Sequence, residues 1–444
     1  MESNCKPDVQ DNQNNLLPDS ETSETEDQNS PPIEQLTKRK KKSVRFLLSR
    51  FCKKCIRQVK RTLRFIQYCF IRRTTLIVPN RIAFMSFSNE YACNPKYIAE
   101  ALLKSGENYE LIWITSKPKS RFPWPYDIKV VKFGTTEAMR AASSAKIWID
   151  NGILFSKNFS LKRGQRHIQT MHGSLGIKRL DQSIASRRKQ GRSGRVTIRR
   201  EEKNTDFVLT NSPFEEECFR TVFWHDTPME RLGHARMDIL FNTDTAFKEE
   251  LKRNVYERYG IPRNKKIVLY GPTFRPDLSD EPLDIDFDSF VQALNKRFGG
   301  EHAVLLRLHV RNMKNKKLMN RLLMSSSVYN ATDYPDIQEL MLLTDVAVTD
   351  YSSWIFDYVV TGRPGLIYAK DEEQYNNLVG LYYLLEDTPF PVCHSNDELL
   401  KAVSDFDMSK YRDRVKAFLD EKEPVDDGHA CERIVAKINE MIRT

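Results

Sequence analysis

The sequence has no apolar run of the roughly 18–20 residues that an α-helix needs to cross a bilayer. Its first residues are polar and acidic, whereas a secretory signal starts with basic residues and continues with an apolar stretch. The eight cysteines are scattered, which favours free thiols in a reducing compartment over a disulfide framework. We therefore expect a cytoplasmic protein, neither secreted nor membrane-spanning.

The sequence also lacks a cluster of metal ligands. Cys52 and Cys55 form a single pair, with no second pair and no histidine at the spacing of a zinc site. We expect no structural zinc and no metal ligand among the functional residues.

The positive charge is confined to one segment of the chain, whose formal net charge is +10. Residues 1–37 carry −8, residues 38–73 carry +15 without a single acid, and residues 74–444 carry +3. Residues 1–37 are rich in Asn, Gln, Ser, Glu and Asp and poor in aromatics. Because such a segment cannot bury enough apolar area to offset its chain entropy, we predict that it is disordered.

Apolar residues of the basic segment 38–73 recur at spacings of three and four. This pattern is typical of a basic amphipathic helix on an anionic membrane surface, where each Lys or Arg contributes about 1 kcal/mol before screening. The same charge has two competing interpretations, which are nucleic-acid binding and a solvated helix packed on the rest of the protein. We favour the membrane surface and expect no nucleic-acid partner.

After residue 80, apolar strands alternate with helical segments. The expected strands are 82–87, 109–114, 128–131, 146–150, 167–171, 207–210, 266–270, 303–309, 328–331, 346–348 and 365–368. Such alternation predicts parallel sheets, with functional groups placed after the carboxyl ends of the strands. The charged helix 247–259 precedes a fresh buried strand, which predicts two α/β domains. The expected divisions of the chain are 1–37, 38–75, 76–245 and 246–444.

The strand 346–348 runs directly into five polar residues that end with Ser352 and Ser353. Hydroxyl residues between a buried strand and a helix bring free backbone N–H groups, hydroxyls and the helix dipole together, which suits a phosphate. Asp357 lies one turn later on the same side as Ser353. The alternative is an ordinary connection in which a serine only caps the helix.

A candidate general base follows the strand 167–171. His172 precedes Gly173 and Ser174, and an imidazole can take up a proton near neutral pH. Glycine at this place permits close approach of a ligand to the backbone. The alternative is a histidine that only caps a turn.

Two further basic features accompany this candidate base. Arg307 and His309 share one face of the strand 303–309. Residues 178–200 hold nine Lys and Arg against one acid and include Gly191 and Gly194. We expect a mobile basic loop there, which either meets a polyanionic acceptor or lipid headgroups or is simply solvated.

Six ordered segments between about residue 80 and residue 435 carry a family resemblance. They are 88–97, 169–178, 233–238, 269–275, 349–357 and 427–433. In order and spacing they resemble the CDP-glycerol glycerophosphotransferase family of teichoic-acid and capsule polymerases. The resemblance implies an α/β protein of the GT-B fold, in which two Rossmann-like domains face a cleft and the second holds most of the nucleotide.

The resemblance also implies a reaction, which is transfer of glycerol phosphate from CDP-glycerol to a polyol-phosphate or lipid-linked glycan acceptor, with release of CMP. The enzyme would work at the cytoplasmic face of the membrane as a peripheral protein. No cofactor is required, although Mg²⁺ could accompany the diphosphate. The alternatives are a CDP-ribitol donor, a GT-B glycosyltransferase that uses a nucleotide sugar, and a basic scaffold with a decayed site.

Matched position by position, the resemblance assigns His172 and His309 to catalysis. His172 would deprotonate the acceptor hydroxyl for attack on the β-phosphorus, while Arg236, Arg307 and His309 would neutralise the diphosphate. The residues assigned to substrate binding are Gly173, Ser174, Arg236, Thr273, Phe274, Arg307, Ser352, Ser353 and Asp357.

The chain departs from the family pattern mainly beside these residues. Met171 precedes His172 where the family has Trp, and Leu175 stands where the family has Pro. Val310 follows His309 in place of another Pro. The residues with chemical roles remain, so the departures bear on the identity of the donor polyol and the acceptor.

Overall fold

The computed structural model describes residues 55–443 except 57, 121, 177, 180–191, 222–223, 276–282 and 310–314. The predictions for the acidic tail 1–37 and for residues 38–54 and 57 of the basic segment lie outside these residues. The chain divides into two units, Met1–Gln67 and Tyr68–Thr444, and both sheets belong to the second. In the described part of the chain, no helix is long and apolar enough to cross a membrane.

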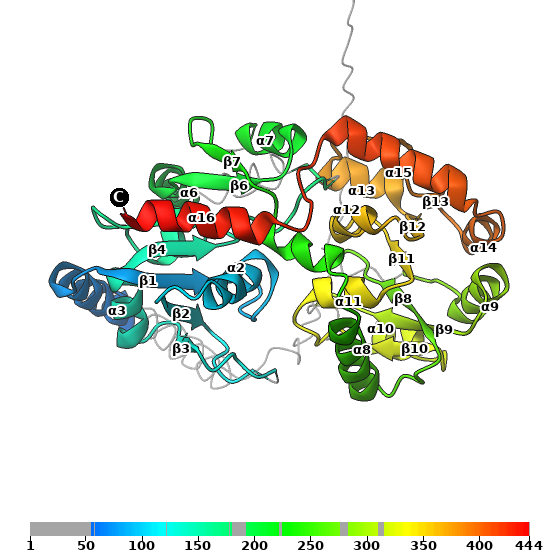
Figure 1. Ribbon diagram of the computed structural model, residues 1–444, viewed down its shortest axis with the longest axis horizontal. Helices are drawn as coiled ribbons and strands as arrows, with labels where there is room; N and C mark the ends of the chain where they lie inside the picture. Colours follow the sequence, from blue (N-terminus) through cyan, green and yellow to red (C-terminus); the bar gives the residue numbers. More distant parts are fainter. Residues whose placement is uncertain are drawn as a thin grey trace, which may run out of the picture. The chain divides into compact units, whose positions relative to one another are not determined.

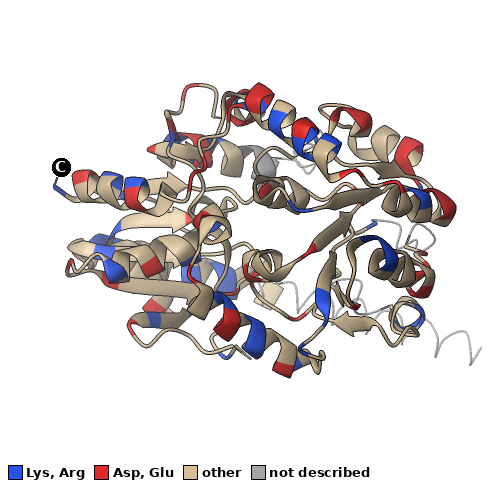
Figure 2. Cartoon of the chain, turned by 45° about the vertical axis from the view of Figure 1, so that its right-hand side comes forward, with Lys and Arg blue, Asp and Glu red and all other residues tan. Residues whose placement is uncertain are grey.

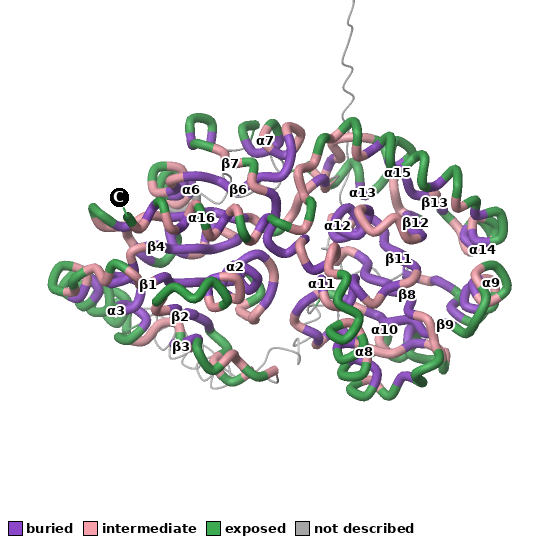
Figure 3. Tube along the Cα trace, viewed as in Figure 1, coloured by how far each residue is buried: buried purple, intermediate pink, exposed green. Residues whose placement is uncertain are grey.

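The first sheet has seven parallel strands in the order β3-β2-β1-β4-β5-β6-β7 (Figure 1). They are β1 (Val78–Met85), β2 (Glu110–Thr115), β3 (Ile128–Lys132), β4 (Ala145–Asp150), β5 (Arg166–Gln169), β6 (Phe207–Thr210) and β7 (Met229–Arg231). Residues 82–85 of the central strand β1 and most of its neighbour β4 are buried (Figure 3), as expected for the centre of a parallel sheet. The sheet grows in opposite directions from these two strands, so its topological switch point lies between β1 and β4.

Among the described residues, six helices connect or cover these strands, and two of them begin at residues with a capping side chain. They are α2 (Cys93–Lys104), α3 (Thr136–Ser144), α4 (Leu154–Asn158), α6 (Arg192–Asn204), α7 (Pro213–Arg220) and the 3₁₀ helix η1 (Ala235–Phe241). The hydroxyl of Thr135 accepts a hydrogen bond at the start of α3, and that of Ser212 does so before α7.

The second sheet has six parallel strands in the order β10-β9-β8-β11-β12-β13. They are β8 (Lys266–Tyr270), β9 (His302–Leu306), β10 (Val328–Asn330), β11 (Val346–Thr349), β12 (Gly365–Tyr368) and β13 (Val392–Cys393). The switch point of this sheet lies between β8 and β11, which pair directly. The two parallel α/β sheets confirm the predicted fold class.

Helices again connect the strands of the second sheet. They are α8 (Thr245–Tyr259), α9 (Phe287–Phe298), α10 (Lys316–Leu322), α11 (Ile337–Leu343), α12 (Trp354–Tyr358), η3 (Val359–Thr361), α13 (Glu372–Val379), η4 (Leu385–Asp387), α14 (Asn396–Ser404) and α15 (Met408–Lys422). Lys and Arg are interspersed with Asp and Glu along the outer helices in Figure 2. This mixture agrees with the small net charge outside the basic segment.

The last helix, α16 (Ala430–Arg443), returns to the first sheet and packs on α2 and η1 (Figure 1). The Asp238 carboxylate accepts hydrogen bonds from the backbone N–H groups of Ala430 and Cys431, at 3.0 and 2.7 Å. Ile434 and Ile438 are fully buried beneath it. The boundary expected near 245/246 therefore separates the two sheets, whereas the end of the chain lies with the first.

Two expected elements differ from the structure. Residues 192–200, expected to be part of a loop, belong to the helix α6. Its buried positions Ile198 and Glu201 have helical spacing, but Glu201 is charged, so the apolar pattern does not reveal the helix. The strand expected at 303–309 ends at Leu306, which places Arg307 and His309 after the strand.

The end of the basic segment is helical over residues 58–74, as predicted. Tyr68 and Ile71 are buried, and Arg72 donates hydrogen bonds to the carbonyl oxygens of Ser160 and Leu161, at 3.0 and 2.7 Å. The interpretation as a helix packed on the rest of the protein therefore holds for residues 68–74.

Candidate active site

The candidate base His172 follows β5, and it contacts residues at the switch point of the first sheet. His172 Nδ1 lies 2.6 Å from the carbonyl oxygen of Asn151, which follows β4. Because a carbonyl oxygen only accepts, Nδ1 carries the proton and Nε2 has the lone pair in the neutral ring. His172 is exposed, so the structure presents the tautomer that a general base needs.

Phe87, which follows β1, covers one face of the imidazole. The two rings stack with their centroids 4.7 Å apart and their planes at 9°. The backbone N–H of Phe87 donates to Asn151 Oδ1 at 2.7 Å, and a Cβ on Gly152 would lie 3.3 Å from the Phe87 ring. The ends of β1 and β4 therefore hold His172 from two sides.

A buried carboxylate fixes the turn that carries Asn151. Asp150 accepts hydrogen bonds from the backbone N–H groups of Gly152, Leu154 and Phe155, at 2.8–3.1 Å. This turn includes Ile153 at a φ of 56°, a backbone conformation that β-branched residues rarely adopt. The carboxylate thus stabilises the strained turn next to His172, the candidate base.

Asp150 belongs to a wholly buried polar group with His167, Gln169 and Glu201. Gln169 Nε2 donates to Asp150 and to Glu201, at 2.9 and 2.7 Å, and Gln169 Oε1 accepts from the N–H of Met171. Burial raises the pKa of the Glu201 carboxyl.

Two groups of side chains in the described part of the chain are spaced closely enough to hold a metal ion, which the sequence did not reveal. They are the buried Asp150, His167 and Glu201, and the more exposed Glu372, Glu386 and His394. The Asp150 oxygens of the first group already accept hydrogen bonds from Gln169 and from the turn that follows β4. Because these oxygens are already hydrogen-bonded, we interpret the group as a network that supports the His172 loop, in preference to a metal site.

The polar residues after β8 and β11 form a second cluster, at the switch point of the second sheet. Asp350 accepts from the backbone N–H of Thr273 and from Arg275, both at 2.8 Å. Arg275 also binds Asp371 through two hydrogen bonds, at 2.6 and 2.8 Å. The Tyr351 ring stacks on that of Tyr375 at 3.9 Å, and Arg275 lies over both rings.

The loop that carries His172 contacts α12 of the second sheet. Ser174 donates to Asp357 at 2.9 Å. A Cβ on Gly176 would lie 2.8 Å from the Cβ of Ser353, so only glycine permits this approach. The Ser353 hydroxyl makes no capping hydrogen bond, which disfavours the interpretation that it only caps the helix.

Arg236 is fully buried in an ion pair with Asp357. Its Nε and Nη2 donate to the two carboxylate oxygens at 2.7 and 3.0 Å. Burial alone would lower the pKa of the guanidinium, but the Asp357 charge raises it above its usual value. In this arrangement Arg236 supports α12 and has no exposed surface for a donor, so the expected contact with the diphosphate stays a prediction.

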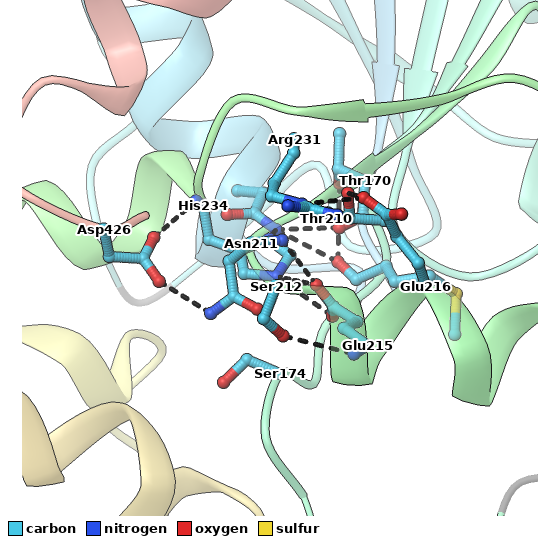
Figure 4. Close-up of polar contacts among 12 residues, drawn as sticks. Thr170, Ser174, Thr210, Asn211, Ser212, Glu215, Glu216, Arg231, His234 and Asp426 are labelled. Atoms are coloured by element: carbon cyan, nitrogen blue, oxygen red, sulfur yellow. Dashed lines mark hydrogen bonds and ion pairs between the residues drawn. The ribbon is translucent and has the colours of Figure 1, made fainter. Parts of the chain in front are cut away.

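A chain of buried polar contacts holds the segment before Arg236 (Figure 4). His234 Nε2 binds the Glu215 carboxylate at 2.9 Å, and the backbone N–H of His234 donates to Asp426 at 2.7 Å. Asn94 donates to the carbonyl oxygen of Met171 and lies 3.3 Å from His234 Nδ1. Residue 94 therefore ties the His172 loop to the segment of Arg236.

The remaining candidates follow β8 and β9, which are neighbours. The ring of Phe274 packs against that of His309 with centroids 5.2 Å apart, and His309 is exposed. Arg307 is half-buried and donates to the carbonyl oxygens of Tyr334 and Pro335, at 3.2 and 3.3 Å. Their predicted contacts with a diphosphate stay predictions.

The sequence did not point to Phe87 or Asn151, nor to the hydrogen bond between Ser174 and Asp357. The first two follow β1 and β4, so the switch point of the predicted sheet is the signal that could have found them.

Comparison with known proteins places this site in a family. The model of the CDP-Glycerol:Poly(glycerophosphate) glycerophosphotransferase family matches residues 66–440. The teichoic acid poly(glycerol phosphate) polymerases of Staphylococcus epidermidis and Bacillus subtilis are 29% and 28% identical, over 87% and 82% of this chain and 56% and 48% of theirs. The chain thus spans about half the length of these relatives.

A shorter relative and a solved structure match over most of their own length. The teichoic acid glycerol-phosphate transferase of Staphylococcus aureus is 26% identical over 81% of this chain and 92% of its own. The structure of the wall teichoic acid polymerase TagF, H548A, has a TM-score of 0.73 at 28% identity, over 88% of this chain and 98% of that chain. The chain belongs to the CDP-glycerol:poly(glycerophosphate) glycerophosphotransferase family.

Proposed function

We propose that this protein transfers glycerol phosphate from CDP-glycerol to a polyol-phosphate or lipid-linked glycan acceptor in teichoic-acid or capsule synthesis, and releases CMP. The observation that carries this proposal is the geometry of His172. Its Nδ1 is fixed as a donor to Asn151, and its loop contacts Ser353 and Asp357 at the switch point of the other sheet. Membership of the family supports the choice of donor.

In the proposed reaction, His172 Nε2 takes the proton of the acceptor hydroxyl. The acceptor oxygen forms a bond to the β-phosphorus, and the bond from that phosphorus to the oxygen of CMP breaks, with the electron pair leaving on CMP. A positioned base of this kind contributes about 10²- to 10⁴-fold to the rate. Arg307, His309 and the hydroxyls of Ser352 and Ser353 are proposed to bind the diphosphate, where negative charge grows.

The Arg236–Asp357 pair is proposed to act by positioning other groups of the site. It holds α12 where Ser174 can bind the same carboxylate. The pair therefore fixes the distance between the base and the proposed phosphate site, which a transfer reaction requires.

CDP-ribitol is the closest competing donor, since a teichoic acid poly(ribitol-phosphate) polymerase of Bacillus spizizenii is 26% identical over 82% of this chain. The test is to supply CDP-glycerol, CDP-ribitol or a panel of nucleotide sugars with a lipid-linked polyol-phosphate acceptor, and to measure nucleotide release. Acceptor-dependent CMP from CDP-glycerol supports the proposal. CMP from CDP-ribitol alone, or nucleotide from a sugar donor alone, overturns it.

The same proposal places the enzyme at the cytoplasmic face of the membrane, bound through residues 38–73. Six large apolar side chains of residues 56–70 are more than half exposed. Phe65 lies on another face of the helix, and the other five have helical spacing and form an apolar stripe that supports the proposal. They are Ile56, Val59, Leu63, Ile66 and Phe70. The transfer is proposed to need no resident cofactor, and titration of CMP release with EDTA and Mg²⁺ measures whether Mg²⁺ accompanies the diphosphate.

A further inference from the structure

Lys178, a cation in the loop that carries His172, contacts residues of the second sheet and has no role in the reaction proposed above. Lys178 Nζ donates to Thr273 Oγ1 at 3.2 Å and lies 5.8 Å from the centroid of the Tyr375 ring. Its backbone is also fixed there, because residue 178 pairs with Leu381 in an isolated antiparallel bridge. The N–H of Arg179 donates to the carbonyl oxygen of Gly380 at 3.0 Å.

The place that Lys178 occupies is the switch point of the second sheet. Thr273 follows β8 and Asp350 follows β11, and the two strands pair with Tyr270 opposite Val348. Open α/β sheets bind ligands beyond the carboxyl ends of the strands at this point. Lys178 thus belongs to the loop that follows β5 and carries His172. Its ammonium group, however, lies at the switch point of the second sheet.

We propose that Lys178 is a ligand of the donor diphosphate, delivered to the second sheet by the loop that carries His172. The inference rests on the proposed function and deepens it. A single loop then brings both the base and a phosphate-binding cation to the reacting groups, so donor binding orders the base.

Among the described residues, the charged groups around Lys178 leave it short of a counter-charge. The groups that act on it are Asp350, Arg275 and the Tyr375 ring. Asp350 is already bound to Arg275 and to the N–H of Thr273. Burial lowers the pKa of Lys178 to about 8, Asp350 raises it, and Arg275 lowers it further. A diphosphate beside Nζ would supply the missing negative charge and raise this pKa.

The pH dependence of donor binding follows from the difference between the pKa of Lys178 in the free protein and in the complex. Both phosphates of CDP-glycerol are diesters and do not titrate near neutral pH, so a proton taken up near pH 8.5 goes to the protein. The donor binds the protonated lysine. Its affinity is therefore full below a pH of about 8 and falls as the pH rises toward the higher pKa of the complex.

The test is titration calorimetry of the full chain with CDP-glycerol and no acceptor, at pH 7 and pH 9. Wild type, Lys178→Met and Lys178→Arg are compared, and their thermal unfolding confirms that each is folded. Loss of a charge-assisted hydrogen bond predicts that Lys178→Met weakens binding at pH 7 by about tenfold to a hundredfold. Lys178→Arg, whose charge does not titrate, is expected to retain binding with equal affinity at both pH values.

Proton uptake gives a second readout. Near pH 8.5, the heat of binding to wild type should depend on the ionisation enthalpy of the buffer, whereas that of Lys178→Arg should not. The inference is overturned if folded Lys178→Met binds CDP-glycerol as tightly as wild type does at pH 7. Failure of wild type itself to bind CDP-glycerol would instead overturn the proposed function, so the two failures are distinct.

Discussion

The imidazole of His172 owes its orientation to one backbone carbonyl and one ring, each from a different strand end. The carbonyl of Asn151 fixes which nitrogen carries the proton, and the stacked Phe87 ring limits rotation. Both neighbours act by geometry alone, so their loss should affect turnover more than donor binding.

Phe87→Leu tests this division. It removes the flat surface behind His172 but keeps an apolar side chain, and misplacement of a base by about 1 Å costs on the order of 100-fold in rate. We expect kcat to fall by about tenfold to a hundredfold with little change in the KM for CDP-glycerol. Phe87→Tyr keeps the ring and extends into solvent, so it should retain most of the activity.

Steady-state kinetics of these two variants at several pH values provide the measurement. Equal losses of kcat in the Leu and Tyr variants would argue against the stacking role. A rise in KM with kcat unchanged would place Phe87 in substrate binding.

The Arg236–Asp357 pair is a residue-scale feature with a stability consequence. Removal of one partner of a buried ion pair leaves the other charge uncompensated, at a cost of about 3–5 kcal/mol. Arg236→Met should therefore lower the free energy of unfolding by about that amount, as measured by urea denaturation. The double variant Arg236→Met/Asp357→Leu should recover part of the loss, and additive losses would show that the two residues do not interact.

The sequence predicts His172 as the candidate base because a histidine before glycines at a strand end has a recognisable local pattern. It could not identify Asn151, whose contribution is a backbone carbonyl, or Lys178, whose partner Thr273 lies 95 residues away. Such contacts depend on which strands become neighbours, and no local pattern encodes them.

At the scale of elements, strands with continuous apolar runs were predicted well, because both faces of a parallel sheet are buried. Helix α6 was missed because Glu201 occupies an inward position that a pattern search assigns to solvent. The Glu201 carboxylate accepts a hydrogen bond there from Gln169, which belongs to strand β5.

The contact between the His172 loop and α12 depends on Gly176. Gly176→Ala would place a Cβ 2.8 Å from that of Ser353 and should push the loop from the helix. We expect a loss of kcat of about tenfold or more with the fold retained, since the change separates the base from the proposed phosphate site. Equal activity of Gly176→Ala and wild type would contradict the close approach.

The helical segment 58–74 gives a prediction about membranes. Leu63→Glu places a charge in the exposed apolar stripe, whereas Gln58→Glu adds the same charge outside it. Burial of a leucine side chain is worth about 1.5–3 kcal/mol, so Leu63→Glu should weaken binding to anionic vesicles by about tenfold or more. Cosedimentation of the full chain with vesicles measures this, and equal effects of the two changes would indicate that only net charge matters.

In the unit Tyr68–Thr444, the two sheets repeat one design. Each is parallel, each has its switch point between its first strand and the strand that reverses its growth, and each gathers polar residues there. Contacts of the His172 loop with Ser353, Asp357 and Thr273 bring the base to the second of these points. This arrangement would let the proposed base and the proposed phosphate site, which come from different sheets, serve the proposed transfer.

The measurement that tests the central claim most directly is acceptor-dependent release of CMP from CDP-glycerol by wild type and by His172→Asn. The variant keeps a polar side chain but has no nitrogen that can take a proton. We predict a loss of about 10²- to 10⁴-fold in the rate, with binding of CDP-glycerol retained. A variant that releases CMP at close to the wild-type rate would contradict the assignment of His172 as the base.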